Sequence, residues 1–227
     1  MNPLSHAVCT SICTGADGVV FGATLKDPMI KGVRDETLPK EVADGKKIHN
    51  RQDEIFDSRT NLIPFRDELF SIIRHFQNPV LDVICDHIVA CNWPLLFEEK
   101  LEDYTKRLYE IIVPRMHLIE SKKRQKIMLM IENDVLASYR TEDGLETGLI
   151  ELAGRSEKGQ VIKDNISGIM DLVPKVEPII LGVLPDVYRE SQSHLRELGY
   201  QPEGRLLYRR EGFLSGEIFN RPNPERR

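Results

Sequence analysis

The order of secondary-structure signals over residues 127–219 most constrains the fold of this chain. Asn133 and Asp134 separate two apolar runs and tolerate the left-handed backbone of a tight hairpin turn. A continuous apolar run over residues 179–183 has the length of a strand that is buried on both faces. These signals predict a sheet in this part of the chain.

Helical signals interrupt the predicted strands. Apolar residues recur at steps of three and four over residues 159–173, which is the period of an amphipathic helix. A second helix is predicted from Asp186, which can cap it, to Leu198, with Gly199 as the stop. The remaining short runs, over residues 147–152, 205–210 and 213–219, are strand-like. The run over 147–152 equally suits a helical turn.

This order resembles the carboxyl-terminal part of the GCN5-related N-acetyltransferase family. The closest local match is IILGVLPDVYRESQSHLRELGYQPEGRLLYRREG, with its Leu198-Gly199-Tyr200 step. The resemblance implies an α+β fold, in which an acetyltransferase-like mixed sheet with flanking helices follows a helical unit and an amino-terminal hairpin. It also implies an acyltransferase that moves an acyl group from acyl-CoA, the co-substrate, to an amine acceptor.

The resemblance also implies where acyl-CoA binds. In that family a glycine-rich turn before a helix holds the pyrophosphate through backbone N–H groups. This chain has RSEKGQV at that place, with a spacing that differs by one residue from the family pattern and without the second small residue. The implied phosphate-binding residues are Arg155, Lys158, Gly159 and Gln160.

A general acid and a general base are implied in the same way. Leu195 occupies the position of the family's catalytic tyrosine, so Tyr188, about two turns earlier on the predicted helix, is the remaining candidate for the acid. Glu146 and Glu151 are the carboxylates near the third predicted strand that could deprotonate an amine. Glutamates are mostly solvent-exposed, so a degenerate protein with no catalytic role for either residue stays open.

The amino-terminal part of the sequence indicates a separate hairpin. Small and apolar residues alternate over residues 6–25 around a glycine-containing turn, which predicts a hairpin. The segment around Cys9 also resembles the start of amino-terminal-nucleophile amidases, in which such a cysteine is the nucleophile. The expected division is a hairpin and polar linker over 1–58, a helical unit over 59–114, the core over 115–219 and a tail over 220–227.

The expected helical unit contains three helices: two with an apolar stripe, over residues 64–77 and 92–114, and a mostly buried one over residues 80–91. Cys85, His87 and Cys91 carry metal-binding side chains within it. On a helix, however, Cys85 and His87 point about 200° apart. No metal site is therefore expected from these residues.

Composition argues against two classes of protein. No apolar run reaches the roughly 18 residues of a membrane-spanning helix, and no leader precedes a cleavage site, so no membrane partner is expected. The net charge of -5 argues against a general nucleic-acid coat. Four Cys in 227 residues do not make a disulfide framework, so a soluble, cytoplasmic protein is expected.

Two alternatives to an acyltransferase remain. The last predicted helix and hairpin, with Arg205, Arg209 and Arg210, also fit the recognition helix and wing of a winged-helix nucleic-acid-binding protein. A non-catalytic interaction protein that binds a protein partner is the other alternative, because the phosphate-binding turn is degenerate and the tyrosine is missing.

Overall fold

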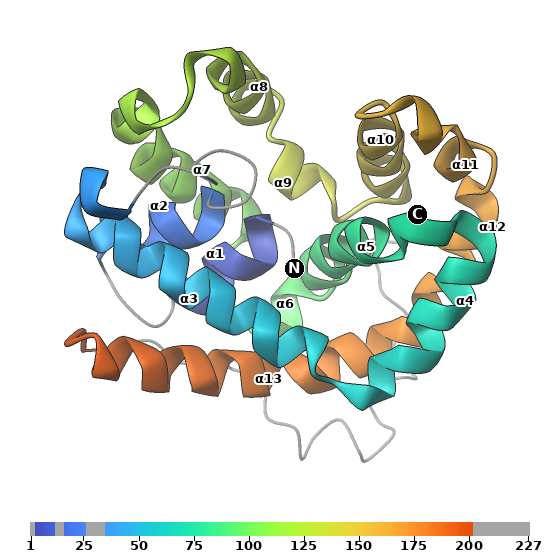
Figure 1. The fold of residues 1–227 in the computed structure, drawn as a ribbon, viewed down its shortest axis with the longest axis horizontal. Coiled ribbons are helices and arrows are strands. Elements are labelled where there is room, and N and C mark those ends of the chain that lie inside the picture. The colour runs from blue at the N-terminus through green and yellow to red at the C-terminus, as the bar shows by residue number, and fades with distance from the viewer. Residues whose placement is uncertain (1–2, 12–15, 26–34, 202–227) are drawn as a thin grey trace.

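The computed structural model describes residues 3–11, 16–25 and 35–201. Every regular element in these ranges is a helix, and the described residues contain no strand (Figure 1). The α-helices are α1 (Pro3–Ser11), α2 (Asp17–Leu25), α3 (Lys40–Asp57), α4 (Ile63–Ile73), α5 (Gln77–Cys91), α6 (Trp93–Leu96), α7 (Leu101–Ile112), α8 (Ser121–Glu132), α9 (Val135–Ser138), α10 (Glu142–Ala153), α11 (Gln160–Lys163), α12 (Ile166–Met170) and α13 (Val173–Glu197). Short 3-10 helices join some of them: η2 (Asp35–Thr37), η3 (Thr60–Leu62), η4 (Arg74–Phe76), η5 (Val113–Leu118) and η6 (Glu157–Gly159).

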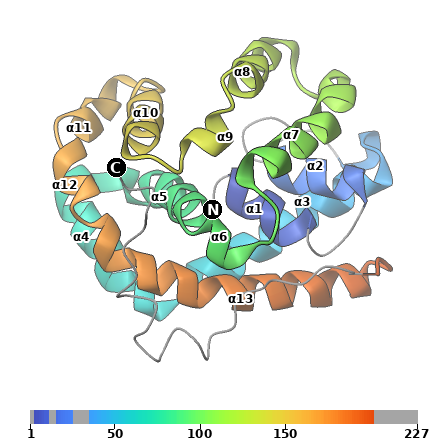
Figure 2. The ribbon, with the colours of Figure 1, turned by 180° about the vertical axis from the view of Figure 1, so that it is seen from behind.

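Helix α5 lies in the middle of the molecule, with α1, α4, α10 and α13 packed around it (Figures 1 and 2). Its residues are apolar nearly all round, and those from Val80 to Ala90 are buried except Asp82. A helix that is apolar on all faces is stable only inside a core. The prediction of a mostly buried helix over residues 80–91 is therefore confirmed.

The expected α+β fold with an acetyltransferase-like sheet is wrong. The apolar run over residues 179–183 belongs to α13, a helix of 25 residues that continues through Pro178 and Pro185. A short apolar run does not by itself distinguish a buried strand from a buried stretch of helix. Asp134 does adopt the expected left-handed backbone, with φ of 43°, but it joins α8 to α9 instead of two strands.

The expected amino-terminal hairpin is also wrong, because its two arms form the helices α1 and α2. The expected linker contains α3, a helix of 18 residues. The last predicted hairpin, over residues 205–219, and the tail lie outside the described residues. The division of the chain at residues 58 and 114 stays a prediction.

A buried carboxylate on α5 fixes the start of α1. The side chain of Asp86 accepts hydrogen bonds from the backbone N–H groups of Leu4, at 3.0 Å, and Ser5, at 2.9 Å. The Ser5 hydroxyl donates to the same carboxylate at 2.6 Å. N–H groups in the first turn of a helix have no partner within the helix, so Asp86 caps α1 from another helix. This contact also sets the position of His6, the next residue.

Burial raises the pKa of Asp86 to about 7, although its bonds to Ser5 and Leu4 oppose the shift. A raised pKa means that the folded state keeps a proton that the unfolded chain has already released between about pH 4 and pH 7. The stability contributed by this group is therefore present at low pH and is lost as the pH rises towards 7.

We predict that Asp86→Asn removes this pH dependence. The parent's free energy of unfolding should fall relative to that of the variant as the pH rises from 4 to 7, by at most about 1.4 kcal/mol per pH unit. Urea unfolding at several pH values measures it. Asp67→Asn, on the exposed face of α4, is the control and should follow the parent profile. Parallel profiles for Asp86→Asn and the parent would contradict the prediction.

Helices α2 and α3 are in unusually close contact through two glycines. A Cβ atom on Gly22 would lie 2.2 Å from the carbonyl oxygen of Val42. One on Gly45 would lie 2.3 Å from the carbonyl oxygen of Val19. Because these neighbours are backbone atoms, they cannot move aside without separating the two helices.

We predict that Gly45→Ala destabilises the protein by about 3 kcal/mol, because the added methyl group forces α2 away from α3. Gly182→Ala is the matched control, since a Cβ there has no atom within 4 Å. The control should gain about 0.5 to 1 kcal/mol, as is usual when alanine replaces a helical glycine. Thermal unfolding compares them, and equal effects would refute the close-contact argument.

Candidate metal centre

Three metal-binding side chains meet between α1 and α3. His6 comes from α1, whereas His49 and Asp53 lie one turn apart on the same face of α3. One ligand atom from each lies within 4.8 Å of the others. The Asp53 carboxylate is 3.2 Å from Nε2 of His6 and 3.1 Å from Nε2 of His49. The two imidazole rings stack, with centroids 3.6 Å apart.

The other ring nitrogen of each histidine contacts an oxygen. Nδ1 of His49 is 2.5 Å from the backbone carbonyl of Ala23 in α2. A carbonyl oxygen only accepts, so this Nδ1 carries the proton. Nδ1 of His6 is 2.6 Å from Oε1 of Gln52. In the neutral ring with a protonated Nδ1, Nε2 carries a lone pair, and in both histidines this atom faces Asp53.

The charges of the cluster follow from its burial. Burial, and then the neighbouring His49, lower the pKa of His6 to about 4, so this ring is neutral at pH 7. Burial alone would raise the pKa of Asp53, but the close contacts of its carboxylate with His49 and His6 outweigh this effect and lower that pKa. A carboxylate therefore faces the Nε2 atom of a neutral ring.

These residues fit a divalent metal ion. A lone pair directed at a carboxylate is unfavourable unless a cation or a proton lies between them. Ligand atoms bonded to one ion at about 2.1 Å lie about 3 to 3.5 Å apart, and the two Nε2 atoms lie at such distances from the Asp53 oxygens. Metal-bound histidines also usually donate their second N–H to an oxygen, as His49 does to Ala23. The described residues supply two imidazoles and one carboxylate for such an ion.

The centre is reached past Asp53. The side chains of His6 and His49 are 0% and 3% exposed, whereas that of Asp53 is 26% exposed. A ligand that approaches from solvent would therefore meet the carboxylate first.

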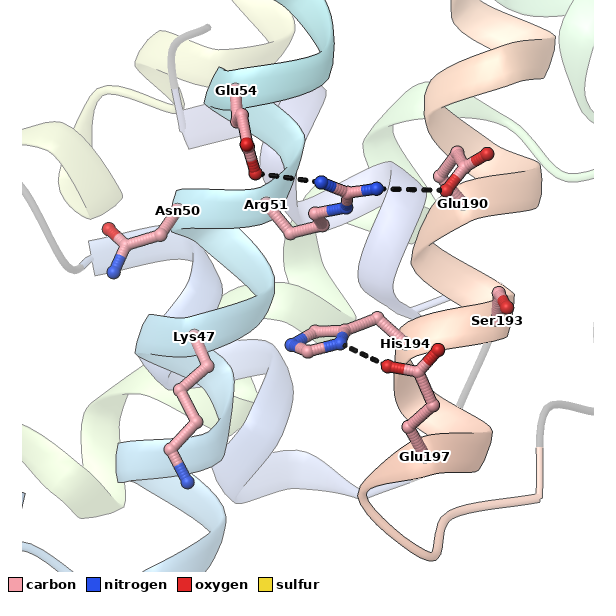
Figure 3. Close-up of a pocket in the computed structure, with 8 residues that line it drawn as sticks. All are labelled: Lys47, Asn50, Arg51, Glu54, Glu190, Ser193, His194 and Glu197. Carbon is pink, nitrogen blue, oxygen red and sulfur yellow. Dashed lines mark hydrogen bonds and ion pairs between the residues drawn. The ribbon is translucent and has the colours of Figure 1, made fainter.

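A separate groove of about 480 Å³ lies between α3 and α13 (Figure 3). Arg51 in this groove is bonded to Glu54 and Glu190, and His194 is bonded to Glu197. Its lining contains three acidic residues and two Lys or Arg residues. Arg51 and His194 are already paired with these glutamates, so little unpaired positive charge faces the groove. The groove therefore does not have the positive charge that an anionic ligand requires.

The structure does not bring the residues expected for acyl transfer together. Glu146 and Glu151 are exposed on α10, whereas Tyr188 lies on α13 and packs with the small cluster around Val19 and Leu195. In Figure 1, α10 and this end of α13 lie on opposite sides of the molecule.

The expected phosphate-binding turn is not a turn into a long helix. Arg155, Lys158 and Gln160 are exposed, and α11 after them has four residues. Gly159 is buried, and a Cβ there would lie 2.0 Å from the carbonyl oxygen of Ala153. This glycine is therefore explained by close chain packing.

The Cys9 alternative does not match the structure either. Cys9 is buried within α1, and burial raises the pKa of its thiol to about 12. The thiolate needed for a nucleophile is therefore absent at neutral pH.

Sequence reasoning missed all three residues of the metal centre. The spacing of His49 and Asp53, four residues apart, was the available signal, because it places both on one face of a helix. A polar linker is predicted for this segment, and a linker gives the two side chains no common face. His6 comes from a distant part of the chain, and no spacing links it to the other two.

The described residues form an all-helical fold that brings together a possible ligand set of two buried histidines and one half-buried aspartate. A profile of the acyl carrier protein phosphodiesterase family matches residues 1–186. The chain therefore belongs to this family, and the resemblance to N-acetyltransferases is wrong. No curated protein and no solved structure matches the chain. Among the described helices, none is both long enough and apolar enough to cross a membrane.

We predict that Mn²⁺ stabilises the protein through this centre. A ligand at 100 times its dissociation constant that binds only the folded state adds about 2.7 kcal/mol. Thermal unfolding with and without Mn²⁺ measures the shift. His49→Ala should abolish it, whereas Glu54→Gln, an exposed carboxylate beside Asp53 in the sequence, should keep it. A shift that His49→Ala leaves intact would place the ion elsewhere.

Proposed function

We propose that this chain is a phosphodiesterase that removes the prosthetic group from acyl carrier protein. The observation that carries the proposal is the His6, His49 and Asp53 cluster in a member of the acyl carrier protein phosphodiesterase family. The family supports hydrolysis of a phosphodiester and does not support transfer of an acyl group from acyl-CoA to an amine. Acyl carrier protein replaces acyl-CoA and the amine as the expected substrate.

The reaction needs water and no other co-reactant. Water adds to phosphorus, the P–O bond between the phosphate and the carrier protein breaks, and the oxygen of the carrier leaves with a proton. A divalent cation bound by His6, His49 and Asp53 would supply Lewis acidity, which stabilises negative charge on phosphoryl oxygens. The chain's own contribution would be to hold that cation with the imidazoles of His6 and His49 and the carboxylate of Asp53, while oxygens at their Nδ1 atoms orient both rings.

Burial supports the same proposal. Charge stabilisation is stronger in a site with little water than in bulk solvent. His6 and His49 are almost fully buried, and Asp53 is the member that solvent reaches. The phosphodiester of a carrier protein would therefore approach from the side of Asp53, and the carrier itself would stay at the surface.

We predict that the purified chain converts carrier protein with its prosthetic group into the form without it. Intact-protein mass spectrometry follows the conversion in Mn²⁺ or Mg²⁺, and a chelator should stop it. Asp53→Asn should lower kcat/KM by at least about 100-fold, because one metal ligand and its charge are weakened. Glu54→Gln should change it less than about twofold.

Two results would contradict this proposal. The first is a parent protein that leaves the carrier protein unchanged with every divalent metal tested. The second is full activity of Asp53→Asn, which would mean that the chemistry uses another site.

A further inference from the structure

Gln52 lies within the metal centre without being one of its ligands. It is 0% exposed on α3, between His49 and Asp53 in the sequence. Its side chain makes three contacts: Oε1 is 2.6 Å from Nδ1 of His6, and Nε2 is 3.0 Å from both the Thr10 hydroxyl of α1 and the Ser191 hydroxyl of α13. This one amide therefore connects three helices to the first histidine of the centre.

The two hydroxyl groups determine which way the amide points. Thr10 donates its only hydroxyl proton to the backbone carbonyl of His6, at 2.9 Å. Ser191 donates its own to the carbonyl of Val187, at 2.8 Å. Both hydroxyl oxygens can then only accept. They accept from the NH₂ group of Gln52, so the amide oxygen is the atom that faces His6.

This orientation determines the tautomer of His6. An amide oxygen only accepts, so Nδ1 of His6 carries the proton and Nε2 carries the lone pair. Nε2 lies 3.2 Å from Oδ1 of Asp53. The other tautomer would place a proton on Nε2 and give a hydrogen bond to that carboxylate. The Gln52 contact favours the tautomer that makes no such bond and that can bind a metal.

We infer that Gln52, oriented by Thr10 and Ser191, is a positioning residue that holds His6 in the metal-binding tautomer. The inference rests on the proposed cation site. It explains why a chain of buried polar side chains from three helices ends at Nδ1 of His6, whereas the metal-binding atom of this ring, Nε2, faces Asp53. A buried polar network of this kind is stable only when all its members are bonded, and Gln52, Thr10 and Ser191 all are.

The tautomer itself is the first test, in the metal-free, full-length protein. Long-range ¹H–¹⁵N spectra of the histidine rings distinguish a proton on Nδ1 from one on Nε2, and His6→Asn assigns the His6 signals. At neutral pH the parent should show the proton on Nδ1. Gln52→Leu keeps the side-chain volume but removes the acceptor, so the proton should move to Nε2 and bond to Asp53. The same tautomer in both proteins would overturn the inference.

Metal affinity is the second test. Titration with Mn²⁺ should show binding 10- to 100-fold weaker in Gln52→Leu, which is the usual effect of removing a partner behind a metal-bound histidine. Gln52→Glu, whose side chain only accepts when ionised, should bind within about threefold of the parent. Gln192→Leu, on α13 beside Ser191 and bonded to Tyr188, is the matched control and should bind as the parent does.

Ser191→Ala tests whether the Ser191 hydroxyl orients the Gln52 amide or only supports the local packing. It should weaken Mn²⁺ binding when residue 52 is Gln, because the amide loses a partner that fixes its direction. It should have no effect in a Gln52→Glu background, because a carboxylate has two equivalent oxygens. Equal effects in both backgrounds would contradict the orienting role.

The two proposals can fail separately. A parent that binds no Mn²⁺ contradicts the cation site, and the tautomer spectra then decide the role of Gln52 alone. A parent that binds Mn²⁺, with a Gln52→Leu variant that binds equally well and keeps its tautomer, overturns this inference and leaves the proposed function standing.

Discussion

The close backbone contact of α2 with α3 is the constraint on which the site depends. Gly22 and Gly45 let the two helices approach until backbone atoms touch. This approach brings the carbonyl of Ala23 within 2.5 Å of Nδ1 of His49. A wider separation would remove that acceptor and leave the ring free to turn. The absence of a side chain at Gly22 and Gly45 therefore decides the orientation of the His49 ring.

Buried polar groups complete what the glycines begin. Asp86 caps α1 from the central helix, and Gln52 connects α1, α3 and α13. An unpaired buried polar group costs free energy, so such groups select the one arrangement of helices in which all are bonded. Apolar packing around α5 holds the helices together, but it specifies their arrangement less strictly than these hydrogen bonds do. The bonded polar groups, in contrast, set the angle and depth at which α1 and α3 present their histidines.

Local patterns predicted individual helices well and the overall fold badly. The stripe of Leu101, Tyr104 and Leu108 indicated α7, and all three are buried. Gly199 indicated a helix end, and it follows α13 with a φ of 91°. The strand predicted over residues 179–183 is wrong, because Pro178 before it indicates a helix break where the structure has none. Proline removes one N–H donor, but α13 continues through it because the buried side chains on either side pack in the core.

The sequence by itself determined the helical stripes of α4, α5 and α7, the end of α13, and the placement of His49 and Asp53 on one face. These depend on residues a few positions apart, whose geometry the local backbone fixes. Only the tertiary structure decided that the apolar runs over residues 147–152 and 179–183 are helical, that His6 meets His49, and that Gln52 faces His6. Each of these depends on a burial partner or hydrogen-bond partner from a distant part of the chain, and the spacing of neighbouring residues carries no information about such partners.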